Sequence, residues 1–265
     1  MLRQLRVGAT GMDAFEKEMV NITNQVSNAK TVGFKKSRIV MENLFPQVME
    51  KVVADLDNEG HQGAIIELGS GVRVVATPKD FSQGSPQVTS NPLDLCINGQ
   101  GLFMVQLSDG STAYTRAGNF HRDDVGNIVD PNGHLLEPNI MIPHDVSNIR
   151  ISADGCVFTR KGGQDQPEIM VGQISIARFS RPEALISIGQ NLFAATEESG
   201  EITEGIPAHE GFGEIAQYTL EGSNVDIVDS MMEMVIVQRS FDIISKAIQI
   251  GESMAKSAIE VARAT

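Results

Sequence analysis

The last forty residues of the chain carry a seven-residue apolar repeat, and this repeat restricts the possible folds more than any other feature. Counting in sevens from Ile227 meets an apolar side chain each time, and the interleaved positions are apolar or small apart from Ser230. The repeat comprises Ile227, Met234, Val237, Phe241, Ile244, Ile248, Gly251, Ala255, Ala258 and Ala262. Such spacing predicts one helix, about 50 Å long at 1.5 Å per residue, that packs lengthwise against another helix. Ser223 and Asn224 predict its N-cap.

The first thirty residues contain a matching repeat. Its positions are Leu5, Gly8, Met12, Phe15, Met19, Ile22, Val26 and Ala29. Small residues fall on both repeats, Gly8 on the first and Gly251 on the second, and they allow two helix backbones to approach closely. We therefore expect the terminal helices to pair with each other, or with the same helices of neighbouring molecules. The alternative is that each helix docks separately on a middle domain.

Composition and charge limit the classes of partner. The net charge is −13 over 265 residues, which argues against a nucleic-acid partner because phosphate binding needs clustered Lys and Arg. No apolar run is long enough to span a bilayer, so we expect no membrane insertion. The N-terminus is typical of an amphipathic helix rather than a signal peptide, which by itself indicates a cytoplasmic protein.

Residues that could carry catalysis form no recognisable motif. Cys96 and Cys156 support no disulfide framework, and the glycines of Gly99-Gln100-Gly101 lack the third glycine of a dinucleotide site. The acidic residues at 123–130 do not have the spacing of a calcium loop. The histidines have no metal-ligand spacing; they are His61, His121, His134, His144 and His209. We expect no enzyme activity, no cofactor and no metal, although a pair of carboxylates of the glycosidase kind stays open because its spacing is spatial.

Between the two helices the period of the apolar pattern changes to two. Alternation such as that of Leu93–Ile97 predicts strands from residue 71 to residue 213. Asn-Gly and Asp-Gly pairs predict hairpin turns at 98–99, 109–110, 132–133 and 154–155. Residues Ile39–Val53 predict a weak helix within a long excursion.

The expected fold is α+β, with long N- and C-terminal helices that pair in a coiled-coil-like manner and a central antiparallel β domain, either a sandwich or an open barrel. The predicted parts are an N-terminal helix and turn (1–35), an extended segment for contact between subunits (36–70), the β domain (71–213) and the C-terminal helix (214–265).

Two short segments stand out from this pattern. In the turn at residues 28–35, Gly33 suits a left-handed backbone and Phe34 suits a side chain anchored in a neighbouring surface. This turn is either a helix C-cap or an exposed recognition loop. Residues 114–120 are either a buried Tyr and Phe around a turn, with Arg116 in a local ion pair, or a packing element presented to a neighbouring subunit.

These features resemble the flagellar rod and hook protein family. The resemblance extends through residues 99–103, 187–193, 199–200, 220–226 and 238–241, and it covers nearly the whole chain. The length of the chain and the segment from residue 71 to residue 84 favour the distal rod branch over the longer hook protein. The residues that match the family motifs are Asn28, Thr31, Gly33, Phe34, Lys35, Tyr114, Thr115, Arg116, Gly118, Phe120, Ser223, Asn224, Val225, Gln238 and Arg239.

The resemblance implies a structural subunit of the flagellar distal rod, which assembles with copies of itself into a helical tube and transmits motor torque to the hook. It implies export through the flagellar type III apparatus without a cleaved signal, and a place in the basal-body rod within the periplasm. The implied partners are proximal rod proteins, the hook protein and the surrounding P- and L-ring proteins. The segment Leu44–Gly69 is implied to contact neighbouring subunits.

Two other functions stay open at this point. The first is the proximal rod paralogue of the same family, which differs in its position in the assembly. The second belongs to a different class, an extracytoplasmic hydrolase that uses carboxylates on the β domain.

Overall fold

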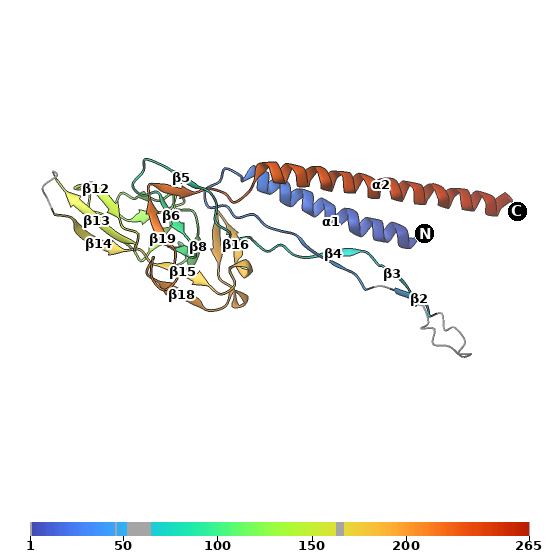
Figure 1. Cartoon of the computed structure of the whole chain (residues 1–265), viewed down its shortest axis with the longest axis horizontal. Helices are drawn as coiled ribbons and strands as arrows, with labels where there is room; N and C mark the ends of the chain where they lie inside the picture. Colours follow the sequence, from blue (N-terminus) through green and yellow to red (C-terminus); the bar gives the residue numbers. More distant parts are fainter. Residues whose placement is uncertain (1, 46, 52–64, 163–166, 265) are drawn as a thin grey trace. The chain divides into compact units, whose positions relative to one another are not determined.

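The computed structural model describes residues 2–45, 47–51, 65–162 and 167–264. The chain divides into two compact units. The helical unit comprises Met1–Val26, Arg38–Thr77 and Ile227–Thr265, and the β unit comprises Ser27–Ser37 and Pro78–Asp226. The predicted α+β composition is confirmed, with a helix near each end of the chain and antiparallel strands between them (Figure 1).

Two long helices form most of the helical unit. Helix α1 spans Leu2–Ser27 and helix α2 spans Ile227–Ala264. Gly8 faces α2 so closely that a Cβ built on it would lie 2.8 Å from Ile248 Cδ1, and one built on Gly11 would lie 3.0 Å from Ile244 Cδ1. The small residues of α1 therefore allow the isoleucines of α2 to approach its backbone.

A ribbon of strands completes the helical unit. Strand β1 (Val40–Asn43) pairs antiparallel with β4 (Val72–Ala76), and β2 (Gln47–Lys51) pairs with β3 (Ile65–Leu68). The predicted helix at Ile39–Val53 is therefore wrong over its described residues. The backbone groups of β1 find their partners in β4, some thirty residues further along the chain, and the local sequence pattern does not reveal this pairing. Residues 46 and 52–64, within the segment expected to contact neighbouring subunits, lie outside the described part.

The β unit is entirely antiparallel among the described strands. Its largest sheet has nine strands, in the order β16-β17-β8-β7-β11-β10-β9, with β15 paired to both β7 and β18. Strands β12, β13 and β14 form a second sheet, and β19-β6 and β20-β5 form two pairs. The bounds are β5 (Pro86–Val88), β6 (Leu95–Asn98), β7 (Leu102–Gln106), β8 (Thr112–Thr115), β9 (His121–Arg122), β10 (Ile128–Val129), β11 (Leu135–Glu137), β12 (Val146–Ile151), β13 (Cys156–Lys161), β14 (Ile169–Gln173), β15 (Ile176–Phe179), β16 (Ile186–Gly189), β17 (Leu192–Ala194), β18 (Ile202–Gly205), β19 (Glu214–Gln217) and β20 (Thr219–Glu221). Two short 3₁₀ helices, η1 (Pro182–Ala184) and η2 (Glu197–Ser199), lie in the connections.

Strand β7 separates two apolar clusters. Phe103 and Val105 point into the larger cluster, while Leu102 and Met104 point into the smaller one, because successive side chains of a strand face opposite sides. Burial on both faces explains why β7 is apolar at four consecutive positions. Each large side chain buried in this way contributes about 1.5–3 kcal/mol.

Three of the four predicted hairpin turns are confirmed. Residues 109–110 join β7 to β8, residues 132–133 join β10 to β11, and residues 154–155 join β12 to β13. The hairpin predicted at 98–99 is wrong, because β6 pairs with β19 and not with β7. Gly99 is still needed there: its φ is +114°, and a Cβ on it would lie 3.0 Å from Gly213 Cα.

The β unit differs from the predicted 71–213 domain at both ends. Residues 214–221, assigned from sequence to the C-terminal helical part, form β19 and β20 because they pair with β6 and β5. Strand β4 belongs to the helical unit, whereas residues 27–37 join the β unit.

Candidate functional site

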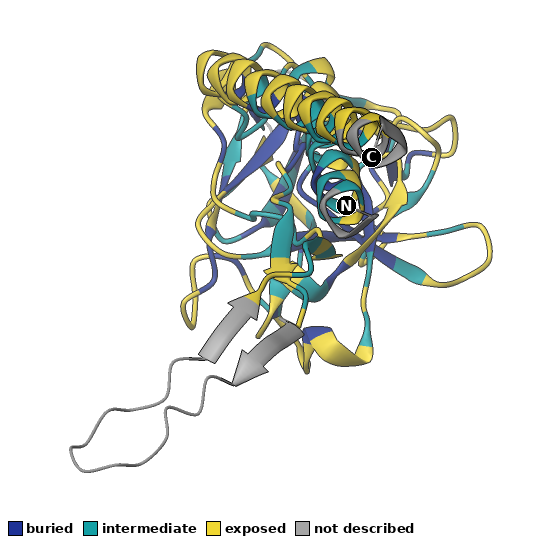
Figure 2. Cartoon of the chain, turned by 90° about the vertical axis from the view of Figure 1, so that its right-hand side faces the viewer, coloured by how far each residue is buried: buried dark blue, intermediate teal, exposed yellow. Residues whose placement is uncertain are grey.

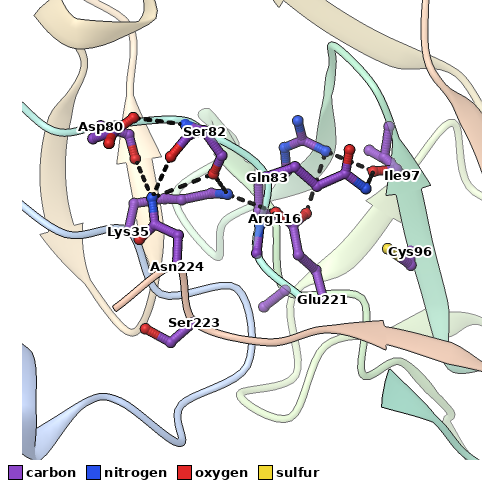
Figure 3. A network of polar contacts seen from close by, with 12 residues as sticks. Lys35, Asp80, Ser82, Gln83, Cys96, Ile97, Arg116, Glu221, Ser223 and Asn224 are labelled. Carbon is purple, nitrogen blue, oxygen red and sulfur yellow. Dashed lines mark hydrogen bonds and ion pairs between the residues drawn. The ribbon is translucent and has the colours of Figure 1, made fainter. Parts of the chain in front are cut away.

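Three charged side chains meet in the interior of the β unit. Lys35, Arg116 and Glu221 are each at most 4% exposed, and they come from three segments far apart in the sequence. Figure 3 shows the hydrogen bonds and ion pairs that link them to their surroundings. Each residue lies in a segment that the sequence singled out, namely 28–35, 114–120 and 220–226.

Lys35 reaches this position because of the turn that precedes it. Gly33 has φ +69°, and a Cβ on it would lie 2.5 Å from Ala117 N, so only glycine fits. Gly33 N donates to Glu221 O at 2.8 Å. The turn is thus buried in the β unit, and the alternative of an exposed recognition loop does not hold for Gly33, Phe34 and Lys35.

Lys35 and Glu221 form the shorter of the two ion pairs in the cluster. Lys35 Nζ donates to Glu221 Oε1 and to Ser82 O, both at 2.6 Å. Glu221 Oε1 also accepts from Gly84 N at 3.0 Å. Burial lowers the pKa of the Lys35 ammonium, and the attraction of the Glu221 carboxylate offsets this effect only in part.

Arg116 supplies the second cation. Its Nη1 lies 3.3 Å from Glu221 Oε2, and the guanidinium donates to Ile97 O at 2.9 Å and to Gly99 O at 2.5 Å. Burial lowers the pKa of Arg116 as well, against the opposing effect of Glu221. The Cys96 thiol nearby has its pKa raised to about 11, first by burial and then by the Glu221 carboxylate, so it stays protonated at neutral pH.

Asn224 extends the network. Its Nδ2 donates to Asp80 O at 2.8 Å, and its Oδ1 accepts from Lys36 N at 2.8 Å. The prediction that Asn224 caps the C-terminal helix is therefore wrong, because α2 begins only at Ile227 and the Asn224 side chain binds elsewhere. Ser223 Oγ accepts from Val225 N.

The arrangement is typical of a buried structural network of hydrogen bonds and ion pairs rather than of a catalytic site. Its charges are buried and bonded to one another and to the backbone. A pocket of about 350 Å³ adjoins Arg116, and its lining includes Phe179, Arg178, Asp80 and Glu183 but no His or Cys. No group of three or more His, Cys, Asp or Glu suited to a metal ion occurs among the described residues. Cys96 and Cys156 are both free thiols.

The other motif residues lie in different surroundings. Tyr114 is buried in the smaller apolar cluster and Phe120 in the larger one. Thr115 Oγ1 donates to Asn191 O and accepts from Ala117 N. On α2, Gln238 and Arg239 are exposed. A carbon on Gly118 would lie 1.8 Å from Leu95 O, so this position also needs glycine.

The residues of the two seven-residue repeats are unevenly buried. Ile22 and Val237 are buried, and Phe241 is exposed. The side chain of Ala258 is outside the described part. Ile227 is also exposed, and the side chain of Ala262 likewise lies outside the described part. The other members are half-buried, namely Leu5, Gly8, Met12, Phe15, Met19, Val26, Ala29, Met234, Ile244, Ile248, Gly251 and Ala255.

Sequence reasoning missed some members of the cluster. Glu221 lay within a noted motif, but nothing in its neighbourhood indicates a partner 186 residues away. Ser82 and Asp80 contribute mainly backbone oxygens, which any residue type provides, so no sequence signal marks them.

Within the described residues no helix is long and apolar enough to cross a membrane.

Comparison with known proteins places the chain in a family. Residues 96–159 match the family described as "Flagellar hook protein FlgE/F/G D1 domain", and residues 216–261 match "Flagellar basal body rod FlgEFG protein C-terminal". The second match includes β20 and most of α2, and the first includes Arg116.

Similar proteins align over nearly the full chain. Proteins named "Flagellar basal-body rod protein FlgG" from Caulobacter vibrioides and Bacillus subtilis are 38% and 36% identical, over 96% and 99% of this chain and 97% and 100% of their own lengths. A "Flagellar hook protein FlgE" from Helicobacter mustelae is 36% identical, but over only 52% of this chain and 30% of its own length. With matches at this identity over both terminal helices and the β unit, the chain belongs to the flagellar basal-body rod and hook protein family, whose members are structural proteins and not enzymes.

Proposed function

We propose that this protein is a structural subunit of the flagellar distal rod, which assembles with copies of itself into a helical tube and passes motor torque toward the hook. The observation that carries this proposal is the end-to-end similarity to proteins named as basal-body rod protein FlgG. The similarity to the hook protein covers only part of each chain, which favours a rod subunit.

The surface of α2 supports self-assembly. Ile236, Ile243 and Ile250 recur every seven residues and are 63%, 67% and 59% exposed. Exposed residues colour most of α2 in Figure 2. Further large apolar side chains are exposed on the same helix, namely Val228, Met231, Met232, Val235 and Met254. A soluble monomer rarely exposes so much contiguous apolar surface, so this helix is suited to contact with other subunits.

The contacts between α1 and α2 support the same proposal. Gly8 and Gly11 face isoleucines of α2 within one chain, which is the close approach expected of a coiled-coil-like pair. In the assembly, the faces of α1 and α2 that meet at Gly8 and Gly11 pair with each other. The exposed stripe of α2, formed by Ile236, Ile243 and Ile250, packs on neighbouring copies.

The remaining partners follow from this place in the basal body. We propose that proximal rod proteins lie below the assembled subunits, that the hook protein lies above them, and that P- and L-ring proteins surround them in the periplasm. Delivery is through the flagellar type III export apparatus.

The test is a substitution on the exposed stripe. Ile243→Asp places a charge where neighbouring copies would bury an isoleucine, so it should abolish polymerisation of the purified protein and swimming of a host strain that depends on it. The matched control is Gln249→Asp, also exposed on α2, which should assemble normally. Circular dichroism should show both variants folded. Normal swimming with Ile243→Asp would contradict the proposal.

A further inference from the structure

The buried charges tie together the segments of the β unit that continue directly into the helical unit. Residues 33–36 follow α1, residues 80–84 follow β4, and residues 221–224 precede α2. Lys35 binds the second segment through Ser82 O and the third through Glu221 Oε1.

A second set of bonds repeats this connection. Glu221 Oε1 accepts from Gly84 N, and Asn224 binds both Lys36 N and Asp80 O. The three segments are therefore linked pairwise by side chains, with every pair joined by at least one hydrogen bond.

Burying this cluster of charges is expected to add little to the free energy of unfolding of the β unit. The cluster holds two cations against one anion. Glu221 Oε2 has the 3.3 Å ion pair with Arg116 Nη1 but no hydrogen bond, and Arg116 Nε has no hydrogen-bond partner among the described residues. Removing charges from water costs free energy, and replacing a buried ion cluster by apolar residues of similar volume is often neutral or stabilising.

We propose that Lys35, Arg116 and Glu221 form a registration device, which holds the three connecting segments in one arrangement that an apolar cluster would not specify. Directional hydrogen bonds between charged groups are satisfied in a single register, whereas apolar side chains tolerate sliding of one segment past another. The inference rests on the proposed function, in which the segment after the end of α1 and the segment before the start of α2 must have one arrangement for copies to assemble.

The experiment compares two variants of the full-length protein. Glu221→Gln leaves two buried cations without an anion and should lower the unfolding midpoint by roughly 10 °C. The triple variant Lys35→Met, Arg116→Met, Glu221→Leu removes all three charges at similar volume, and its midpoint should return to within about 3 °C of the parent.

Hydrogen exchange then separates registration from stability. In the triple variant, strands β7 and β13 should keep their protection, while residues 33–36, 80–84 and 221–224 exchange about tenfold faster. Assembly of the triple variant should be lost although the β unit is stable. The matched control is Glu168→Gln, which removes an anion that also pairs with two cations, Arg150 and Arg160, but at a more exposed position, and it should change neither exchange in these segments nor assembly.

Two results would overturn the inference. One is parental exchange in all three segments of the triple variant, and the other is loss of protection in β7 and β13 as well, which would make the cluster an ordinary part of the core. If the parent protein itself fails to polymerise, the proposed function is wrong, but the exchange pattern still decides whether the cluster sets register.

Discussion

The two units of this protein differ in how far their large apolar side chains are buried. In the β unit, large residues such as Phe103, Ile128 and Leu136 are almost wholly buried within one chain. In the helical unit, isoleucines at seven-residue spacing on α2 stay exposed. The β unit therefore obtains its stability from its own core, whereas the helical unit leaves large apolar side chains exposed, which suits contact with other molecules.

The difference indicates which property a substitution should affect in each unit. A substitution in the β unit should act on the free energy of unfolding of the isolated molecule. A substitution on the exposed face of α2 should leave that free energy unchanged and act on assembly. Variants in the two units test this division, and the largest effect on folding is expected in the core of the β unit.

Phe103→Ala should destabilise the protein most. Phe103 is fully buried and packs edge-on against Phe120 with 5.2 Å between ring centroids. Its loss removes buried area and leaves a cavity, which costs about 3–5 kcal/mol. Urea unfolding followed by circular dichroism measures the change. Val88→Ala is the control, because Val88 is 88% exposed and its truncation should cost less than about 0.5 kcal/mol.

Gly33→Ala should follow, with a loss of about 3 kcal/mol. The left-handed backbone at Gly33 disfavours any Cβ, and the new atom would also meet the backbone of Ala117. Gly110→Ala is the matched control, since Gly110 has φ +84° but open space around it. It should cost only about 1 kcal/mol. Equal losses in the two variants would show that the close contact at Gly33 contributes nothing.

Sequence patterns predicted those parts of the fold whose signals are local. The seven-residue repeats marked both terminal helices, because each repeat is complete within its own helix. Asp109-Gly110 and Asn132-Gly133 marked hairpins, because each pair lies in the short turn between two strands that pair directly. Gly33 was recognised for its left-handed backbone, which is a property of the residue itself.

Features that depend on distant partners were not predictable. The strands at Val40–Asn43 and Val72–Ala76 specify each other across a long excursion, and neither has a strong pattern alone. The Asn98-Gly99 pair had the same composition as the true hairpins, but β6 finds its partner in β19. Lys35 was selected by resemblance, and only the structure shows that Glu221 and Arg116 surround it.

Asp130 gives a pH-dependent prediction within the β unit. Burial alone would raise the pKa of this carboxyl, but hydrogen bonds from His134 and Asn132 outweigh it and leave the pKa below its ordinary value. A lowered folded-state pKa stabilises the fold above the unfolded-state value, near 3.9, and this contribution is lost as the pH falls through the folded-state pKa.

Asp130→Asn should therefore cost about 1–2 kcal/mol at pH 6 and progressively less below pH 4. Urea unfolding of the parent and the variant at a series of pH values measures the difference. The exposed Asp124→Asn is the control and should show little effect at any pH. A difference between parent and Asp130→Asn that stays constant down to acidic pH would mean that the carboxylate charge is not what stabilises this turn.

The smallest effect on folding is expected at Ile243, and the neighbouring isoleucine makes the comparison sharp. Ile243 is exposed, whereas Ile244 is half-buried and approaches the Gly11 backbone of α1. Ile243→Ser should change the free energy of unfolding of the monomer by less than about 0.5 kcal/mol, while Ile244→Ser should loosen α1 and speed its amide exchange. Because the two substitutions share residue type and helix, any difference between them reports which face of α2 is covered within one chain. If Ile243→Ser instead sped the amide exchange of α1, the face of α2 that carries Ile243 would already be covered within the monomer. The contrast between the two units would then be wrong.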